Sequence, residues 1–177
     1  MTVFGENKLK IEQTNLEKVQ LISPPTIFED FRGEYIEIYN KSLMSESGIE
    51  IEFIQDDISI SRKNVLRGLH GDNKTWKLVS CLYGSFYLVV LNLDQKSSQY
   101  GEHVSFTLSD KNRKQVLIPP NHANGHLVLS DEAIFHYKQN SNYDRSSQFT
   151  IKWNDPKFKI WWPISDPIVS KRDQCHE

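Results

Sequence analysis

Three basic side chains lie in a stretch whose other large residues look like core. In NVLRGLHGDNKTWKLV they are Arg67, His70 and Lys77, and the stretch IFHYK repeats the pattern with Tyr137. A histidine can take up or release a proton near neutral pH, and a guanidinium can hold a phosphate through paired hydrogen bonds. These residue types would allow proton transfer beside an anionic group. Taken singly, each is more often a hydrogen-bonded strand histidine, a solvated edge lysine or a packed tyrosine.

Strand geometry decides which of these side chains can share a cavity. Arg67 and His70 are three residues apart, so strict alternation would place them on opposite faces of a strand. A bulge or kink at Gly68 would turn both toward one cavity. Lys77 and Tyr137 each share a face with apolar neighbours two residues away. The pattern therefore predicts one shared cavity if Gly68 bends its strand.

Other site chemistries have less support in the sequence. A metal-binding jelly roll usually offers two close histidines and a carboxylate, whereas His70 has no second histidine nearby. His122 and His126 are four residues apart but are expected to flank a turn, and a two-histidine site with Asp72 stays open as an alternative. The chain has no nucleophile elbow. It also has no glycine-rich phosphate loop, so side chains would have to hold any phosphate.

Closely spaced strands must position these side chains. Period-2 apolar patterns rich in β-branched residues recur from Val19 onward, with turn residues between them. Helical periodicity is weak and is limited to stretches near 41–48 and 155–160. So many short strands predict one all-β domain over residues 1–177, a jelly-roll barrel or sandwich with short helices. The expected strands are 19–23, 34–40, 51–61, 64–70, 76–84, 85–94, 103–109, 114–120, 125–131, 133–139 and 147–153.

Composition and charge restrict the class of protein. The 177 residues are enough for one domain with a substantial core. A net charge of −2 provides no excess of positive charge for binding nucleic acid or an anionic membrane. No apolar run approaches the ~20 residues that span a bilayer. The N-terminal stretch lacks the apolar region of a secretory signal, and Cys81 and Cys175 make neither a disulfide framework nor a zinc site. We therefore expect a cytoplasmic protein without nucleic-acid or membrane partners.

Several short motifs occur together in an order typical of one enzyme family. They are FEDFRGEYIE (28–37), FIQDDISIS (53–61), VLRGLH (65–70), WKLV (76–79), GSFYLVVLNLD (84–94), LIPPNHANGHLVLS (117–130), FHYK (135–138), IKWNDP (151–156) and VSKRD (169–173). On these motifs the chain resembles the nucleotide-sugar epimerases typified by dTDP-4-dehydrorhamnose 3,5-epimerase, over about residues 19–173. The resemblance implies a cupin-type jelly-roll homodimer, without metal or cofactor, whose N-terminal strands are exchanged between subunits.

The resemblance also implies catalytic roles for the polar residues of the opening stretch. His70 is the expected base that removes a proton next to a C4 ketone, and Asp173 is expected to orient its imidazole. Tyr137 matches the acid that returns a proton on the opposite face. Lys77 matches the donor that stabilises the enolate oxygen, and Arg67 is expected to pair with the diphosphate.

Binding of the nucleotide is carried over from the same family pattern. Phe28 matches an aromatic residue that stacks on the base, and Tyr143 lies where a second aromatic ring could close a sandwich. Arg32 and Glu37 match polar contacts from the N-terminal strands. Because these strands are expected to exchange, Phe28, Arg32 and Glu37 are expected to serve the site of the partner subunit. Further residues expected to line the same mouth are Gln55, Ser59 and Ser61.

Three positions depart from the family pattern. Asn124 stands where a histidine is usual beside the sugar, and asparagine cannot relay a proton, so one inversion step is expected to be lost or the sugar to be held differently. Gly71 replaces an aromatic residue and is expected to leave room for a larger sugar, such as a heptose. Asp57 stands where asparagine is common, and a carboxylate suits the adjacent N–H donors of guanine, which favours a GDP-sugar.

The expected function is inversion of C3, C5 or both in an NDP-4-keto-6-deoxy sugar. A GDP-linked heptose or a dTDP-linked hexose would be the substrate, in sugar synthesis for capsule or lipopolysaccharide. A 3,4-ketoisomerase of the same fold is one alternative, although its relatives usually carry paired histidines where this chain has Gly71 and Asp72. A non-catalytic nucleotide-sugar binding module is the other, and it has no need of a base and an acid on opposite walls.

Overall fold

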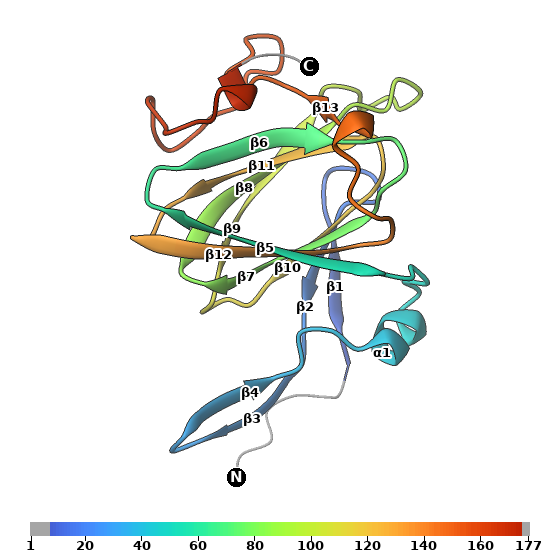
Figure 1. The fold of residues 1–177 in the computed structure, drawn as a ribbon. Coiled ribbons are helices and arrows are strands. Elements are labelled where there is room, and N and C mark those ends of the chain that lie inside the picture. Colours follow the sequence, from blue (N-terminus) through green and yellow to red (C-terminus); the bar gives the residue numbers. More distant parts are fainter. Residues whose placement is uncertain (1–7, 175–177) are drawn as a thin grey trace.

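Two antiparallel β-sheets stack face to face around the core of the molecule (Figure 1). The computed structural model describes residues 8–174. One sheet has six strands in the order β1-β2-β10-β7-β12-β5, and the other has five in the order β13-β6-β11-β8-β9. The strands are β1 (Lys10–Gln13), β2 (Gln20–Ser23), β3 (Thr26–Asp30), β4 (Gly33–Ile36), β5 (Gln55–Arg62), β6 (Leu66–Gly71), β7 (Lys77–Tyr83), β8 (Ser85–Asn92), β9 (His103–Ser109), β10 (Gln115–Ile118), β11 (His122–Val128), β12 (Glu132–Gln139) and β13 (Phe149–Thr150). The predicted all-β jelly-roll class is confirmed.

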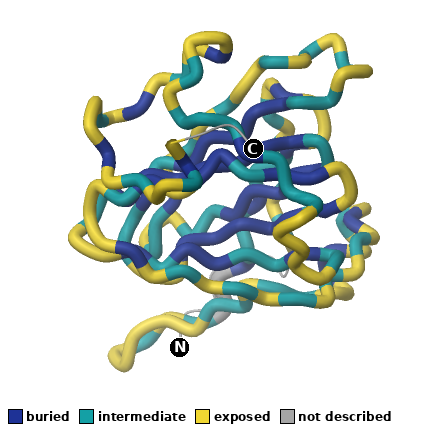
Figure 2. Tube along the Cα trace, turned by 45° about the horizontal axis from the view of Figure 1, so that its top comes forward, coloured by how far each residue is buried: buried dark blue, intermediate teal, exposed yellow. Residues whose placement is uncertain are grey.

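Alternation along the strands fills the space between the sheets with apolar side chains. Val79 and Phe135 from the six-stranded sheet pack there with Phe86 and Leu88 from the five-stranded sheet. A second cluster covers the outer side of the five-stranded sheet beneath the C-terminal segment, and a third packs α1 (Lys41–Glu46) onto the six-stranded sheet. In Figure 2 the buried residues accordingly follow the strands, and the exposed ones follow the connecting loops.

A β-bulge at Gly68 bends β6 as the sequence predicts. Asn124 of β11 is opposite His70, but His126 is opposite Arg67, so three residues of β6 span two of β11. Gly68 has φ +114°, and a Cβ there would lie 2.6 Å from the carbonyl oxygen of Asn124. Only glycine fits this close approach. The extra residue places Arg67 and His70 on the same side of the strand, where both line one cavity.

Several predicted boundaries are wrong. β11 begins at His122, so His122 and His126 lie within a strand and do not flank a turn. The predicted strand 34–40 ends at Ile36, and the predicted helix near 155–160 consists of turns. The strands β1 and β3 were not expected, whereas the short helix near 41–48 is present, with Asn40 as its N-cap.

The β3–β4 hairpin projects away from the two sheets (Figure 1). Its two strands pair only with each other among the described residues. An ion pair from Arg113 to Glu34 ties it to the β9–β10 turn. At its tip Phe31 is 98% exposed, and within β4 Tyr35 is 63% exposed. The hairpin therefore carries exposed aromatic rings away from the core.

Within residues 8–174, every helix is too short or too polar to cross a lipid bilayer. Of the two cysteines, Cys81 is free and buried, and Cys175 lies outside the described residues. The structure therefore does not test the expectation that the two cysteines form no disulfide framework, because it does not describe Cys175.

Candidate active site

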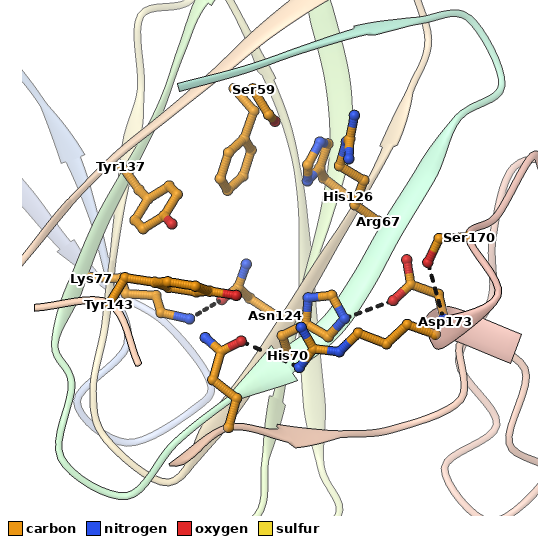
Figure 3. A pocket seen from close by; sticks show the side chains of 13 residues that line it. Ser59, Arg67, His70, Lys77, Asn124, His126, Tyr137, Tyr143, Ser170 and Asp173 are labelled. Atoms are coloured by element: carbon orange, nitrogen blue, oxygen red, sulfur yellow. Dashed lines mark hydrogen bonds and ion pairs between the residues drawn. The ribbon is translucent and has the colours of Figure 1, made fainter. Parts of the chain in front are cut away.

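A cavity of about 340 Å³ is lined by residues from both sheets and from the C-terminal segment. It brings together residues that are far apart in the sequence, as Figure 3 shows. All four expected catalytic residues line it, and so do four of the expected binding residues. The lining residues are Ser59, Arg67, His70, Lys77, Asn124, His126, Phe135, Tyr137, Tyr143, Gln148, Ser170, Arg172 and Asp173.

His70 and Asp173 form a hydrogen-bonded pair at one wall. The Nε2 atom of His70 is 2.6 Å from Oδ1 of Asp173. Burial opposes ionisation of Asp173, but hydrogen bonds from His70 and Ser170 lower the pKa of its carboxyl group. An ionised carboxylate only accepts hydrogen bonds, so it requires the proton of a neutral imidazole to be on Nε2. The Nδ1 atom of His70 is then the one that can accept a proton from a substrate.

Lys77 is buried without a carboxylate in contact. Its Nζ atom donates to Oδ1 of Asn124 at 3.3 Å. Burial lowers the pKa of Lys77 to about 8, a shift that the charge of Asp72 partly opposes. A buried ammonium group with one neutral partner is poised to stabilise a developing negative charge. Because Lys77 occupies the amide oxygen of Asn124, the Nδ2 of Asn124 remains as a donor at the same place (Figure 3).

Tyr137 lies on the opposite sheet from His70. It comes from β12 of the six-stranded sheet, whereas His70 comes from β6 of the five-stranded sheet. Burial raises the pKa of the Tyr137 phenol, and the charge of Asp57 and a hydrogen bond to it raise it further. The phenol is therefore protonated at neutral pH. A base and a protonated acid thus face one cavity from two sheets.

His126 is a member of the site that the sequence predicts only as an alternative metal ligand. Its ring stacks on Phe135 with centroids 4.1 Å apart, and its Nε2 atom has no hydrogen-bond partner. Burial, and then the charge of Arg67, lower its pKa to about 3, so the ring is neutral. The alternation of side chains along β11 could have indicated it, because His126 is two residues from Asn124. No group of three His, Cys, Asp or Glu side chains within residues 8–174 is placed to hold a metal ion.

The expected nucleotide residues divide into two groups. Tyr143 and Ser59 line the cavity, and Gln55 accepts from the backbone N–H of Tyr143 at 2.8 Å. Asp57 faces Gln55 and Tyr137, and one of its oxygens accepts from the amide of Gln55 at 2.8 Å. The second group lies on or next to the β3–β4 hairpin, outside the cavity of its own chain, and consists of Phe28, Arg32 and Glu37.

Two features of the cavity differ from expectation. A Cβ at Gly71 would lie 2.2 Å from the carbonyl oxygen of His122 and 2.7 Å from the ring of Phe149. The expected room for a larger sugar at Gly71 is therefore wrong, because backbone and an aromatic ring already fill it. Arg172, which the motif VSKRD contains, adds a second guanidinium to the lining. Gln148 and Ser170 also line the cavity, and the only signal for them in the sequence is their place beside motif residues.

Comparisons with known proteins identify the family of the chain. The family model described as dTDP-4-dehydrorhamnose 3,5-epimerase matches residues 13–177. The dTDP-4-dehydrorhamnose 3,5-epimerase of Escherichia coli is 39% identical over 171 residues, which cover 94% of this chain and 92% of that protein. The enzyme of the same name from Shigella flexneri is 39% identical over 157 residues, covering 86% and 87%. A crystal structure of dTDP-6-deoxy-D-glucose-3,5-epimerase from Legionella pneumophila, in complex with dTDP-4-keto-L-rhamnose, superposes with a TM-score of 0.88 at 35% identity, covering 93% and 89%.

Proposed function

Because this chain belongs to the dTDP-4-dehydrorhamnose 3,5-epimerase family, we propose that it inverts carbon centres next to the C4 ketone of a dTDP-linked 4-keto-6-deoxy hexose. The observation that carries the proposal is the placement of His70 and Tyr137 on facing sheets of one cavity. Inversion needs a base on one face of the sugar and an acid on the other. Lys77, from the same sheet as Tyr137, supports a charged enolate.

The reaction follows from the protonation states of these groups. The Nδ1 atom of His70 takes the proton of the carbon next to the ketone, and the electron pair moves to the C4 oxygen. The ammonium of Lys77 stabilises this enolate. The hydroxyl of Tyr137 then delivers a proton to the opposite face of the same carbon, and the ketone is restored. The enzyme is left with an imidazolium and a phenolate, which exchange one proton through solvent before the next turnover.

The residue at position 124 decides how many centres are inverted. An amide can donate to the sugar but cannot relay a proton. The amide oxygen of Asn124 is already bound by Lys77, which directs its N–H groups at the substrate. We propose that C3 is inverted, and that inversion of C5 is slower or lost because position 124 lacks a titratable group.

A GDP-linked heptose is the second candidate substrate, and Asp57 is the feature that favours it. A free oxygen of this carboxylate would accept from the adjacent N–H donors of guanine. Gly71 adds no support, because the space beside it is filled. The relatives carry dTDP in their names, which favours the thymidine nucleotide. In either case we place the reaction in the cytoplasm, within the synthesis of sugars for capsule or lipopolysaccharide.

We propose that a homodimer completes the site. The hairpin that carries Phe28 and Arg32 lies outside the cavity of its own chain. On the outer side of edge strand β5, Ile58 is 59% exposed and Ile60 is 55% exposed. An apolar sheet face beside a projecting hairpin supports association with a second copy. The aromatic ring of Phe28 would then stack on the nucleotide base bound by the partner subunit.

Mixing two inactive variants tests this arrangement. His70→Asn removes the base, and Phe28→Ala with Arg32→Ala removes the hairpin contacts. If the hairpin serves the partner's cavity, co-refolded dimers recover up to about a quarter of the wild-type activity, since half are mixed and each mixed dimer has one intact site. If each hairpin serves its own cavity, mixing recovers no activity.

Nuclear magnetic resonance in D₂O tests the function itself. The enzyme is mixed with dTDP- and GDP-linked 4-keto-6-deoxy sugars, hexose and heptose, and deuterium is followed at C3 and C5. Label at C3 alone shows that position 124 limits the C5 step, and label at both shows that asparagine is tolerated. His70→Asn is the control and should incorporate none. No label with any substrate would contradict an epimerase and support a binding module, whereas movement of the ketone would indicate a 3,4-ketoisomerase.

A further inference from the structure

Asp57 and Tyr137 are direct partners on neighbouring strands of the six-stranded sheet. In the register of β5 and β12, Tyr137 lies opposite Asp57. Two residues away along each strand, Phe135 lies opposite Ser59. Ser59, Phe135 and Tyr137 line the cavity. Because side chains alternate along a strand, Asp57 lies on the same inward side as these residues. The carboxylate is therefore beside the expected acid.

Two amide groups hold the carboxylate of Asp57 in this position. Its Oδ2 atom accepts from Nε2 of Gln55 at 2.8 Å and from Nε2 of Gln139 at 3.4 Å. Gln139 is 2% exposed, and Gln55 is itself held by the backbone N–H of Tyr143. A carboxylate fixed by one buried and one half-buried amide has a defined direction toward its remaining neighbour. That neighbour is Tyr137, its cross-strand partner, whose phenol has its pKa raised by the charge of Asp57 and by a hydrogen bond to it.

We propose that Asp57 is a positioning residue that orients the hydroxyl of Tyr137 and keeps it protonated until the enolate forms. The role rests on the function proposed above. Both reacting groups would then have an aspartate partner, since Asp173 holds the base as Asp57 holds the acid. The family resemblance places asparagine at position 57, so this partnership is a property of the present chain.

The charges around Tyr137 explain how Asp57 affects the protonation of the phenol. Asp57 faces the phenol from β5, Lys77 comes from β7, and Tyr143 comes from the segment after β12. His70 faces it across the cavity from β6. The ammonium of Lys77 favours a phenolate, whereas the carboxylate of Asp57 disfavours it. After Tyr137 has given its proton to the sugar, the same carboxylate drives the phenolate to regain a proton from solvent.

Titration of Tyr137 tests the proposal without any substrate. Enzyme labelled with ¹³C at the Cζ of tyrosine is titrated by NMR, and the Tyr137 signal is assigned by its loss in Tyr137→Phe. We expect wild-type Tyr137 to ionise above its ordinary value of 10.0. In Asp57→Asn, an isosteric change, the midpoint should fall by roughly one pH unit or more because the charge is gone. Equal midpoints in the two proteins would overturn the proposal.

Asp56→Asn is the matched control, because Asp56 lies on the outer side of the same strand and pairs with His136 and Lys138. It should leave the Tyr137 midpoint unchanged. A similar shift in both variants would mean a general effect of charge and would also overturn the proposal.

A second measurement distinguishes a role of Asp57 in orienting Tyr137 from a role in binding the nucleotide base. Asp57→Asn should lower the ratio of inverted product to deuterium wash-in severalfold, with little change in KM. A rise in KM for the GDP-sugar together with an unchanged titration would show that Asp57 binds the base instead. If no sugar is turned over, the function proposed above fails, and the titration still decides the role of Asp57.

Discussion

Residues 8–174 contain two hydrogen-bonded histidine–aspartate pairs with similar geometry and different surroundings. In the cavity, Nε2 of His70 is 2.6 Å from Asp173. On the outer side of the six-stranded sheet, Nε2 of His136 is 3.0 Å from Asp56. Among the described residues, His70 has no partner for its second nitrogen, whereas Nδ1 of His136 bonds the hydroxyl of Ser80 at 2.8 Å. Only the first imidazole therefore has an atom available to a substrate.

The two aspartates differ in the same way. The side chain of Asp173 is 4% exposed and that of Asp56 is 53% exposed. Asp56 is also bound by the ammonium of Lys138 at 2.7 Å, so its charge is shared with a second cation. The comparison shows that a histidine–aspartate pair indicates a base only when one ring nitrogen faces a cavity. Five predictions would break or sharpen this contrast.

The largest effect should come from replacing the two histidines in the same way. His70→Asn should lower kcat by roughly 10²–10⁴-fold and abolish deuterium wash-in, because an amide cannot take up a proton. His136→Asn should leave kcat within about twofold, because its imidazole lies on the opposite face of β12 from the cavity-lining Phe135 and Tyr137. Steady-state rates and wash-in by NMR measure both. Equal losses in the two variants would show that the contrast between the pairs is false.

Lys77→Met should have the next largest effect. Loss of the ammonium should lower kcat by roughly 10²–10³-fold, as for removal of an oxyanion donor. In the wild type this stabilisation is present while Lys77 is protonated, so kcat should fall as the pH rises through about 8. A pH profile of kcat measures this limb. A profile that is flat from pH 7 to about 10 would contradict a charged Lys77 in the reaction.

The same variant should be more stable than the wild type. Unfolded Lys77 keeps its proton up to about its ordinary value of 10.5, whereas the folded chain holds it only up to about 8. Ionisation of Lys77 therefore destabilises the fold below pH 8, and this penalty fades between the two values. The difference corresponds to at most about 3 kcal/mol in the free energy of unfolding at pH 7. Denaturant unfolding of Lys77→Met measures the gain.

Much of the fold can be predicted from the sequence because both sheets bury one regular face. Alternation of apolar residues predicts β7, β8 and β12 nearly to their ends, whereas the strand predicted over 51–61 begins four residues before β5. The short polar strands β1, KIEQ, and β3, TIFED, carry little such alternation. Their pairing is set by β2 and β4, the neighbouring strands. Tertiary context, which a local pattern does not contain, decides those elements.

The site is predictable where a motif or a backbone requirement marks it. Gly68 predicts the bulge that aligns Arg67 with His70, because a local glycine can bend a strand. The stacking of His126 on Phe135 comes from strands that are brought together by the sheet packing, so no spacing predicts it. The filled space beside Gly71 likewise depends on β11 and on Phe149, which are distant in the sequence.

Asp173→Asn should have a smaller effect on catalysis than either change above. The amide oxygen can still accept from Nε2 of His70, but the negative charge that stabilises the imidazolium is lost. We expect kcat to fall by roughly tenfold to a hundredfold. Asp56→Asn is the matched change in the outer pair and should leave kcat unaltered. A loss in Asp173→Asn as small as in Asp56→Asn would mean that the inner aspartate does not assist the base.

The smallest effect should be on stability in the outer pair. Ser80 is 4% exposed, and His136→Asn leaves its hydroxyl without the imidazole, at a cost of about 1–3 kcal/mol in the free energy of unfolding. Burial opposes ionisation of Asp56, but hydrogen bonds from Lys138 and His136 lower its pKa below the ordinary 3.8. The stabilisation by this carboxylate is thus present above that value and is lost as the pH falls through the lowered one. Unfolding in denaturant at pH 7 and at about pH 3 measures both contributions. If His70→Asn destabilises the chain more than His136→Asn, the outer pair is not the structural one and the division of roles between the two pairs fails.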